Sequence, residues 1–234
     1  MRTACLIAIL AVAPLGAPAA ELPRGDCKRP AARTDLSACD LSGAKLGGKD
    51  LRGARFAGAK LENADFRKAR LDEADFRGAN AKWSNFSRAS LKAADFRKAD
   101  LFHAIFDEAD LSDARLNDAY LFGANLINTR AARADISGAH LKDILMEGID
   151  LSGGSIRGCY AFRGVLSGAK LVGADLSGAD LTGAAAENAD FSKAKLAGTR
   201  LSGATLRFAV FAEADMAGAD LANADVWSAN FAQV

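Results

Sequence analysis

The chain is poor in the residues that enzymes use most often for catalysis. It has only two histidines and four cysteines among its 234 residues. It contains no Gly-x-Ser-x-Gly elbow and no glycine-rich phosphate loop ahead of a helix. Catalysis needs converging groups of different chemical types, so we expect no enzymatic activity and no cofactor. The loop spacing of calcium motifs is also missing, and we expect no metal site.

A strong net charge is missing too. Thirty Lys and Arg residues face 29 Asp and Glu residues, so no global field attracts nucleic acid or an anionic membrane. The charge is unevenly distributed, however. Residues 45–100 carry 14 basic and 8 acidic residues, whereas residues 172–234 carry 4 basic and 8 acidic ones. This drift is compatible with an ordinary solvated surface as well as with a functional dipole.

Long apolar runs are limited to the N-terminus. Residues 4–13 are apolar, follow the basic Arg2 and precede the small-residue triplet Ala17-Pro18-Ala19. The run is too short for a membrane span, which needs about 20 apolar residues. The pattern is typical of a secretory signal peptide over residues 1–19, cleaved after Ala19 or one residue later. We therefore expect a secreted protein whose mature chain has no membrane span.

A strict period of five residues organises the rest of the chain. Forty positions, 36, 41, 46 and so on to 231, are called centres here, and 36 of them are Leu, Ile, Val, Phe or Met. Ala fills 29 of the 40 positions two residues before a centre. Asp or Asn fills half of the 40 positions directly before a centre. The register has no insertion or deletion. The remaining centres are small: Ala81, Ala131, Ala161 and Ala186.

Period five fits neither regular secondary structure. On an α-helix, successive centres would spread around the whole axis, and on a strand they would alternate between faces. A chain that bends at every pentapeptide instead closes a square in 20 residues, with centres inside. Stacked coils would bond backbone to backbone, a ladder that proline cannot join. All four prolines precede the repeats. Forty pentapeptides predict ten coils and a rod of about 48 Å.

The repeats resemble the pentapeptide-repeat family, whose signature is Ala-(Asp/Asn)-(Leu/Phe)-x-x. Residues 64–68, Ala-Asp-Phe-Arg-Lys, and residues 174–178, Ala-Asp-Leu-Ser-Gly, are two of the matching pentapeptides. The resemblance covers residues 34–234 and leaves residues 20–33 as an N-terminal cap segment. It implies an all-β fold, a right-handed quadrilateral parallel β-helix. It implies no single activity. Because such repeats are commonest in bacteria, the expected destination is the periplasm.

Three classes of function stay open at this point. The first is a periplasmic binding or scaffold module with an unknown protein or glycan partner. The second is a DNA-mimicking inhibitor or protector of DNA gyrase, a role of some cytoplasmic family members. A signal peptide and a neutral chain argue against it, since a DNA mimic is acidic. The third is a polysaccharide-active β-solenoid, which needs a cleft with paired carboxylates.

The expected mature chain keeps three cysteines. Cys27 and Cys39 lie 12 residues apart and could form a disulfide in an oxidising compartment. Against this pairing, Cys39 stands at an inward repeat position, so the sequence leaves it open. Cys159 also holds an inward position and is expected to be a buried packing residue.

One side of the rod carries an unusual set of outward residues. Positions beside a centre point outward, because side chains alternate along an extended chain. Around the centres Ala81 to Ala161 these positions hold aromatic residues, including both tyrosines and both histidines, with Lys142, Asp143 and Arg163 beside them. Exposed aromatics in one strip mark recognition surfaces. Two alternatives would equally explain the strip: a terminal segment could fold over the aromatic residues, or the aromatic residues could simply pack against one another. The predicted binding face comprises Trp83, Phe102, His103, Tyr120, Phe122, His140, Tyr160 and Phe162.

Two further expectations concern special places in the stack. Residues 144–164 have no Ala at the small position, and Ile144 and Ile149 look oversized there, which predicts a widened or bent coil. At the other place, residues 227–231 bring Trp227 and Phe231 close to the C-terminus. A homodimer through this end would cover the last coil and its unpaired backbone edge. The alternative is a frayed end exposed to solvent.

Overall fold

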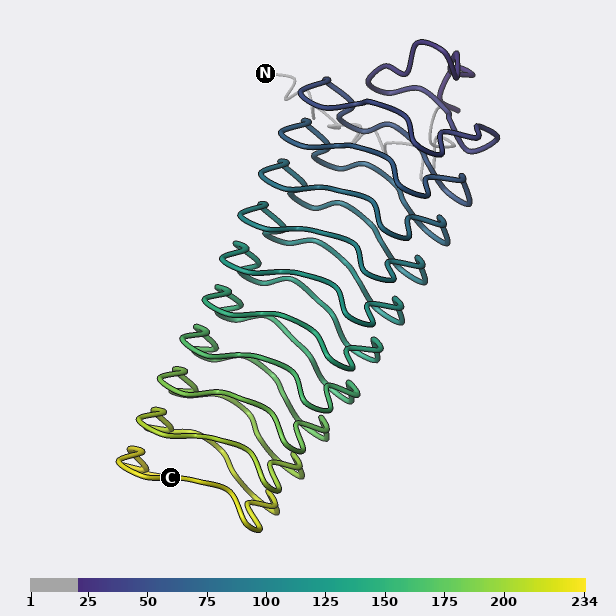
Figure 1. The fold of residues 1–234 in the computed structure, drawn as a ribbon. Helices are drawn as coiled ribbons and strands as arrows, with labels where there is room; N and C mark the ends of the chain where they lie inside the picture. The colour runs from purple at the N-terminus through teal and green to yellow at the C-terminus, as the bar shows by residue number, and fades with distance from the viewer. Residues whose placement is uncertain (1–20) are drawn as a thin grey trace, which may run out of the picture.

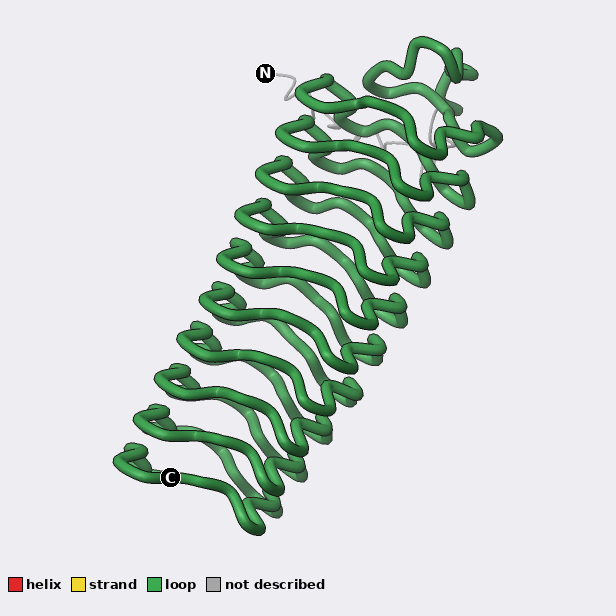
Figure 2. Tube along the Cα trace, viewed as in Figure 1, coloured by secondary structure: helices red, strands yellow, loops and turns green. Residues whose placement is uncertain are grey.

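The computed structural model describes residues 21–234, which form one straight stack of four-sided coils (Figure 1). No helix or multi-residue strand occurs in this range, as Figure 2 shows. Instead, single-residue parallel bridges join the residue directly before a centre to its equivalent 20 residues later, such as Lys60 to Asn80. The signal peptide expected at residues 1–19 lies outside the described residues.

Each pentapeptide makes one side and one corner of the square. The carbonyl of Leu41 accepts a hydrogen bond from the N–H of Ala44 at 3.0 Å, closing a turn in which Gly43 has a φ of +66°. A positive φ at the third turn position defines a type II turn and explains the frequent Gly there. The residue before the centre fixes the turn from outside, because the Asp40 carboxylate accepts the N–H of Ser42 at 3.1 Å.

The coils are joined along the axis by backbone hydrogen bonds. The N–H of Leu61 donates to the carbonyl of Asn80 at 2.7 Å, and the N–H of Asn80 donates back to Ala59 at 3.0 Å. This pattern repeats on all four faces. We number the faces by their centres: face I runs from Leu41 to Leu221, face II from Leu46 to Val226, face III from Leu51 to Phe231 and face IV from Leu36 to Met216, each in steps of 20.

The interior is filled by the centres and the small residues, as the sequence predicts. Two columns of phenylalanines stand on opposite faces, with Phe56, Phe76 and Phe96 on face IV and Phe66 and Phe86 on face II. Rings within a column are nearly parallel at 4.6–4.9 Å between centroids. Rings of the two columns meet edge to face at 5.6–5.9 Å. Each such pair contributes about 0.5–1.5 kcal/mol beyond its buried area.

The coil distortion predicted at residues 144–164 is wrong. Ile144 and Ile149 are fully buried, and the bridges keep their 20-residue spacing through this stretch. The reason is compensation between neighbouring coils. Gly164 lies one coil beyond Ile144, and a Cβ on Gly164 would stand only 3.3 Å from Ile144 Cγ2. At Ile144 the missing side chain of Gly164 makes room for the large one, whereas Ile149 is accommodated next to Ala169.

The N-terminal segment covers the first coil. A disulfide joins Cys27 to Cys39, and the N–H of Gly25 donates to the carbonyl of Asp35 at 2.8 Å. The segment passes directly over the inward Leu36, because a Cβ on Gly25 would meet Leu36 Cδ2 at 2.5 Å. Cys39 remains buried while bonded. The inward position and the disulfide are therefore compatible at the end of the stack.

Candidate functional site: an aromatic strip along one edge

The outward tyrosines and one histidine form the flat part of the strip. Tyr120, His140 and Tyr160 stand directly before centres of face I and are joined by successive bridges. Their neighbours Leu121 and Leu141 point into the core and are fully buried. Alternation therefore turns the aromatic rings outward, where Tyr120 is 40% and Tyr160 38% exposed. The histidine ring contacts both tyrosine rings, at 5.6 and 5.9 Å between centroids.

Phenylalanines continue the strip around the corner between faces I and II. Phe102, Phe122 and Phe162 each follow a face I centre and are half-buried. The Phe102 and Phe122 rings lie 5.6 Å apart at 9°. Phe162 lies beside Tyr160 at 6.2 Å and 5°. In the coil between Phe122 and Phe162, Lys142 takes the equivalent position, and its Nζ lies 5.7 Å from the Phe122 ring centroid. The rings therefore cover one another's faces and present mainly their edges.

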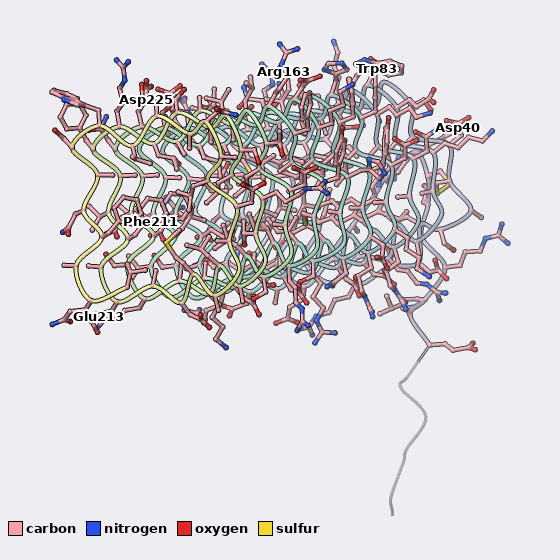
Figure 3. All side chains as sticks on the ribbon, turned by 90° about the horizontal axis from the view of Figure 1, so that it is seen from below. Asp40, Trp83, Arg163, Phe211, Glu213 and Asp225 are labelled. Atoms are coloured by element: carbon pink, nitrogen blue, oxygen red, sulfur yellow. A yellow bond between two sulfur atoms is a disulfide. The ribbon has the colours of Figure 1, made fainter. Side chains whose placement is uncertain are left out.

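Trp83 and His103 occupy the corner itself in the left-handed backbone region. Their φ angles are +55° and +52°, a conformation that is costly for a bulky side chain. Trp83 is 47% exposed and contacts Phe102 edge to face at 5.4 Å. The next coil makes room for the imidazole of His103, because a Cβ on Gly123 would stand 2.5 Å from its Cε1. Figure 3 shows Trp83 and Arg163 projecting from the same edge of the rod.

The structure thus brings all eight predicted residues into one strip, and no described segment folds over Trp83, Tyr120 or Tyr160. Ion pairs flank it, with Lys82 Nζ 3.1 Å from Asp100 and Arg163 Nε 3.9 Å from Asp143. The sequence reasoning missed an aliphatic extension on face II. The sequence contains a signal for this extension: outward positions directly before or after several face II centres hold apolar residues, whereas polar residues are usual there. The extension comprises Ile105, Ile127, Leu145 and Val165.

The opposite face has a different chemistry. On face III, Asp110 has Arg130 at 3.3 Å and Lys92 at 3.6 Å. Partial burial opposes ionisation of Asp110, but hydrogen bonds from Ser112 and the nearby Arg130 outweigh it and lower the pKa of the carboxyl group. Asp110 is therefore paired with neighbouring bases, which is unlike the exposed negative array that a DNA mimic presents.

Other features of a catalytic or metal site are missing from the part of the chain described. Residues 21–234 contain no cluster of three or more His, Cys, Asp or Glu side chains placed to hold a metal ion. A shallow hollow of about 610 Å³ lies at the corner between faces IV and I. Its Arg77 and Arg97 are held by Asp75 and Asp95 at 2.7 and 2.6 Å. Within the same residues, no helix has the length and apolar character of a membrane span.

Comparison with known proteins agrees with this architecture. The family described as Pentapeptide repeats matches in eight copies, over residues 34–72, 74–113, 114–153, 165–198 and 199–234. HetL, a pentapeptide repeat protein involved in heterocyst differentiation regulation from the cyanobacterium Nostoc sp. strain PCC 7120, is 30% identical. That match covers 82% of this chain and 88% of HetL, with a TM-score of 0.44.

Two further solved structures are similar to the chain. QnrB1, a plasmid-mediated fluoroquinolone resistance protein, is 24% identical in one of its trypsin-treated forms, covering 78% of this chain and 89% of that one at a TM-score of 0.42. A pentapeptide repeat protein of the Arabidopsis thaliana thylakoid lumen is 30% identical over 45% of this chain and 66% of its own, at a TM-score of 0.22. No significant match was found among curated protein sequences. The chain belongs to the pentapeptide-repeat family and folds as a right-handed quadrilateral parallel β-helix.

Proposed function

We propose that this protein is an exported, non-enzymatic binding module that captures a protein partner through the aromatic strip. The observation that carries the proposal is the contiguous run of outward aromatic rings on face I and its corner. These positions elsewhere in the stack are mostly polar or small. Large aromatic side chains contribute most of the binding energy in protein interfaces, and a continuous apolar patch on a monomer is uncommon.

A protein surface suits the strip better than a glycan. Sugar rings bind by lying flat on an aromatic face, which must be open to solvent. Phe102 and Phe122 are too close together, at 5.6 Å, for a sugar ring to enter between them. Lys142 covers the other face of Phe122. Ring edges together with the aliphatic side chains of Leu145 and Val165 match apolar side chains of a partner. Backbone addition of a partner strand is unsuited to this face, because its backbone groups already bond between coils.

Two features support export. The N-terminal pattern of Arg2, the apolar residues 4–13 and Ala17-Pro18-Ala19 is typical of a cleaved signal peptide. The disulfide between Cys27 and Cys39 is a bond that persists in oxidising compartments such as the periplasm. N-terminal sequencing of the purified protein should begin at Ala20 or Glu21. An intact Met1 on protein recovered from the cytoplasm would refute export.

The binding proposal is tested by a pair of matched triple variants. One carries Tyr120→Ser, Phe122→Ser and Tyr160→Ser. The control carries Arg130→Ser, Ala132→Ser and Lys170→Ser, which are the equivalent positions half a coil away, on face III and the corner beyond it. All six side chains point outward, so both variants should keep the circular dichroism spectrum and melting temperature of the parent within a few degrees.

The two variants are then compared with the parent in pull-downs from periplasmic extract and in co-sedimentation with purified peptidoglycan. We expect partner proteins captured by the parent and by the control to be lost from the strip variant. Equal capture by all three proteins would refute the strip as the binding site. Binding to peptidoglycan that the strip variant alone loses would instead identify a glycan ligand.

A further inference from the structure

The two ends of the solenoid differ in how well their interior is covered. At the N-terminal end, the centres Leu36, Leu41, Leu46 and Leu51 are at most 4% exposed. At the C-terminal end, Val226 is 39% and Phe231 37% exposed. Figure 1 shows the N-terminal segment, in purple, at the first coil, while the last coil, in yellow, ends the stack. Within residues 21–234, only the first coil therefore has a cap.

The last coil also has unpaired backbone groups. In the earlier coils, the N–H of a centre and that of the residue two positions later donate to the next coil, with Ala38 in the first coil as the exception. In residues 214–234 the eight equivalent N–H groups have no acceptor among the residues described, and four carbonyls have no donor. The N–H groups belong to Met216, Gly218, Leu221, Asn223, Val226, Ser228, Phe231 and Gln233, and the carbonyls to Ala214, Ala219, Ala224 and Ala229.

The first coil has the complementary set. Its matching positions offer eight carbonyls and four N–H groups toward a preceding coil. The cap occupies three of these: Gly25 donates to Asp35, Arg33 donates to Arg52 at 3.0 Å, and Asp35 donates to Pro23 at 2.8 Å. The others have no backbone partner among residues 21–234. They are the carbonyls of Ser37, Asp40, Ser42, Lys45, Gly47 and Asp50, and the N–H groups of Asp40, Lys45 and Asp50.

Register and charge are also compatible between the two ends. In the pentapeptide register, the position after Val234 is equivalent to Asp35, where the first side begins. A second chain could therefore continue the ladder without a shift. Residues 215–234 carry three acidic and no basic residues, whereas the first coil, residues 35–54, carries three of each. The acidic last coil therefore meets no net charge of the same sign on the first coil of another copy.

We propose that the last coil binds the N-terminal end of a second copy of this chain, and that the disulfide-held cap keeps that end closed. The bond between Cys27 and Cys39 ties the segment across Leu36. A dithiol reductant would transfer two electrons and two protons, giving two thiols and the oxidised dithiol. The segment is then free to leave the three backbone groups that it occupies. Copies stack head to tail, and because each joined copy exposes a new last coil, assembly continues beyond a dimer.

A two-fold dimer through the last coils fits these observations less well. It would place eight N–H donors and four carbonyls against an identical set, so most donors would lack an acceptor. It would also bring two acidic ends together, with Asp215, Asp220 and Asp225 on each side. Head-to-tail contact pairs donors with acceptors and places the acidic end against a coil without net charge. It also buries Val226 and Phe231 on the first coil of the next copy.

The test measures assembly of the purified chain by sedimentation velocity and negative-stain electron microscopy, with and without dithiothreitol. The oxidised chain should stay at one size. The reduced chain, and the double variant Cys27→Ser, Cys39→Ser, should form species that lengthen with protein concentration. Adding Phe231→Lys to the double variant should abolish the growth, since it places a charge in the end contact. Circular dichroism checks that each variant keeps the β-solenoid.

A second variant opens the cap without touching the cysteines. Gly25→Val puts a side chain against Leu36, and it should promote assembly even in the oxidised chain. The proposal is overturned if the folded double variant and Gly25→Val both remain at the size of the oxidised parent. It is equally overturned if the oxidised parent forms a dimer that Phe231→Lys dissociates, because the last coils of two copies would then be paired.

Discussion

Faces I and III of the same coils have one backbone and two kinds of surface. At residues 120 and 140, face I presents Tyr and His outward, whereas face III presents Arg and Asp at residues 130 and 150. In these coils the inward centres of both faces, Leu121 and Leu141 on face I and Ala131 and Leu151 on face III, are small or aliphatic and fully buried. The comparison shows that the inward positions specify the coil while the outward positions are free to specify a ligand. We therefore expect single substitutions at outward positions to change the proposed binding without changing the fold.

The strongest test of this separation compares an inward with an outward phenylalanine. Phe86 is fully buried between Phe66 and Phe106, and Phe86→Ala should lower the free energy of unfolding by about 3–5 kcal/mol. Phe122→Ala, on the strip, should lower it by only about 1 kcal/mol, because it removes a half-buried stacking contact with Phe102. Guanidinium unfolding followed by circular dichroism gives both values. Comparable losses would show that the strip is part of the core.

The next prediction concerns the stretch where Ile replaces the usual Ala. Gly164→Ala should cost about 1–3 kcal/mol, because its Cβ would lie 3.1 Å from the Ala161 carbonyl and 3.3 Å from Ile144 Cγ2. The double variant Ile144→Ala, Gly164→Ala restores the small-residue stack found elsewhere in the rod. It should cost less than the sum of the single changes, as a double-mutant cycle of unfolding free energies would measure. Strict additivity would mean that the two positions do not compensate.

Ile144 and Gly164 also show how much of the structure could be predicted from the sequence. The period of five predicted the coil, the buried centres and the outward strip, because each depends only on position within one pentapeptide. The distortion at Ile144 was predicted wrongly because compensation acts between residues 20 apart. The aliphatic extension at Leu145 and Val165, in contrast, could have been predicted, because apolar residues at these outward positions are visible within single pentapeptides. The path of the cap over Leu36 lies outside any repeat, so no periodic rule could place it.

A smaller effect separates stability from recognition on the strip itself. Trp83 has a φ of +55°, which costs an L-residue about 1–2 kcal/mol relative to Gly. Trp83→Gly should therefore raise the melting temperature while weakening partner capture. The matched control is Ala93→Gly at the corner half a coil away, where φ is +54°. It should give a similar gain in stability with unchanged capture. Partner capture that survives Trp83→Gly would remove Trp83 from the binding site.

The smallest change tests alternation at two adjacent residues. Cys159 is 1% exposed and Tyr160 is 38% exposed, although they are neighbours in the chain. Burial raises the pKa of the Cys159 thiol to about 12, despite backbone hydrogen bonds that favour the thiolate. At pH 8 roughly one molecule in ten thousand would then carry the reactive thiolate. Iodoacetamide should leave Cys159 unmodified in the folded protein and alkylate it in urea, whereas tetranitromethane should nitrate Tyr160 without unfolding. Peptide mass spectrometry distinguishes the two products. Alkylation of Cys159 in the folded protein would mean that this coil opens, since the inward side chain has no other path to the reagent.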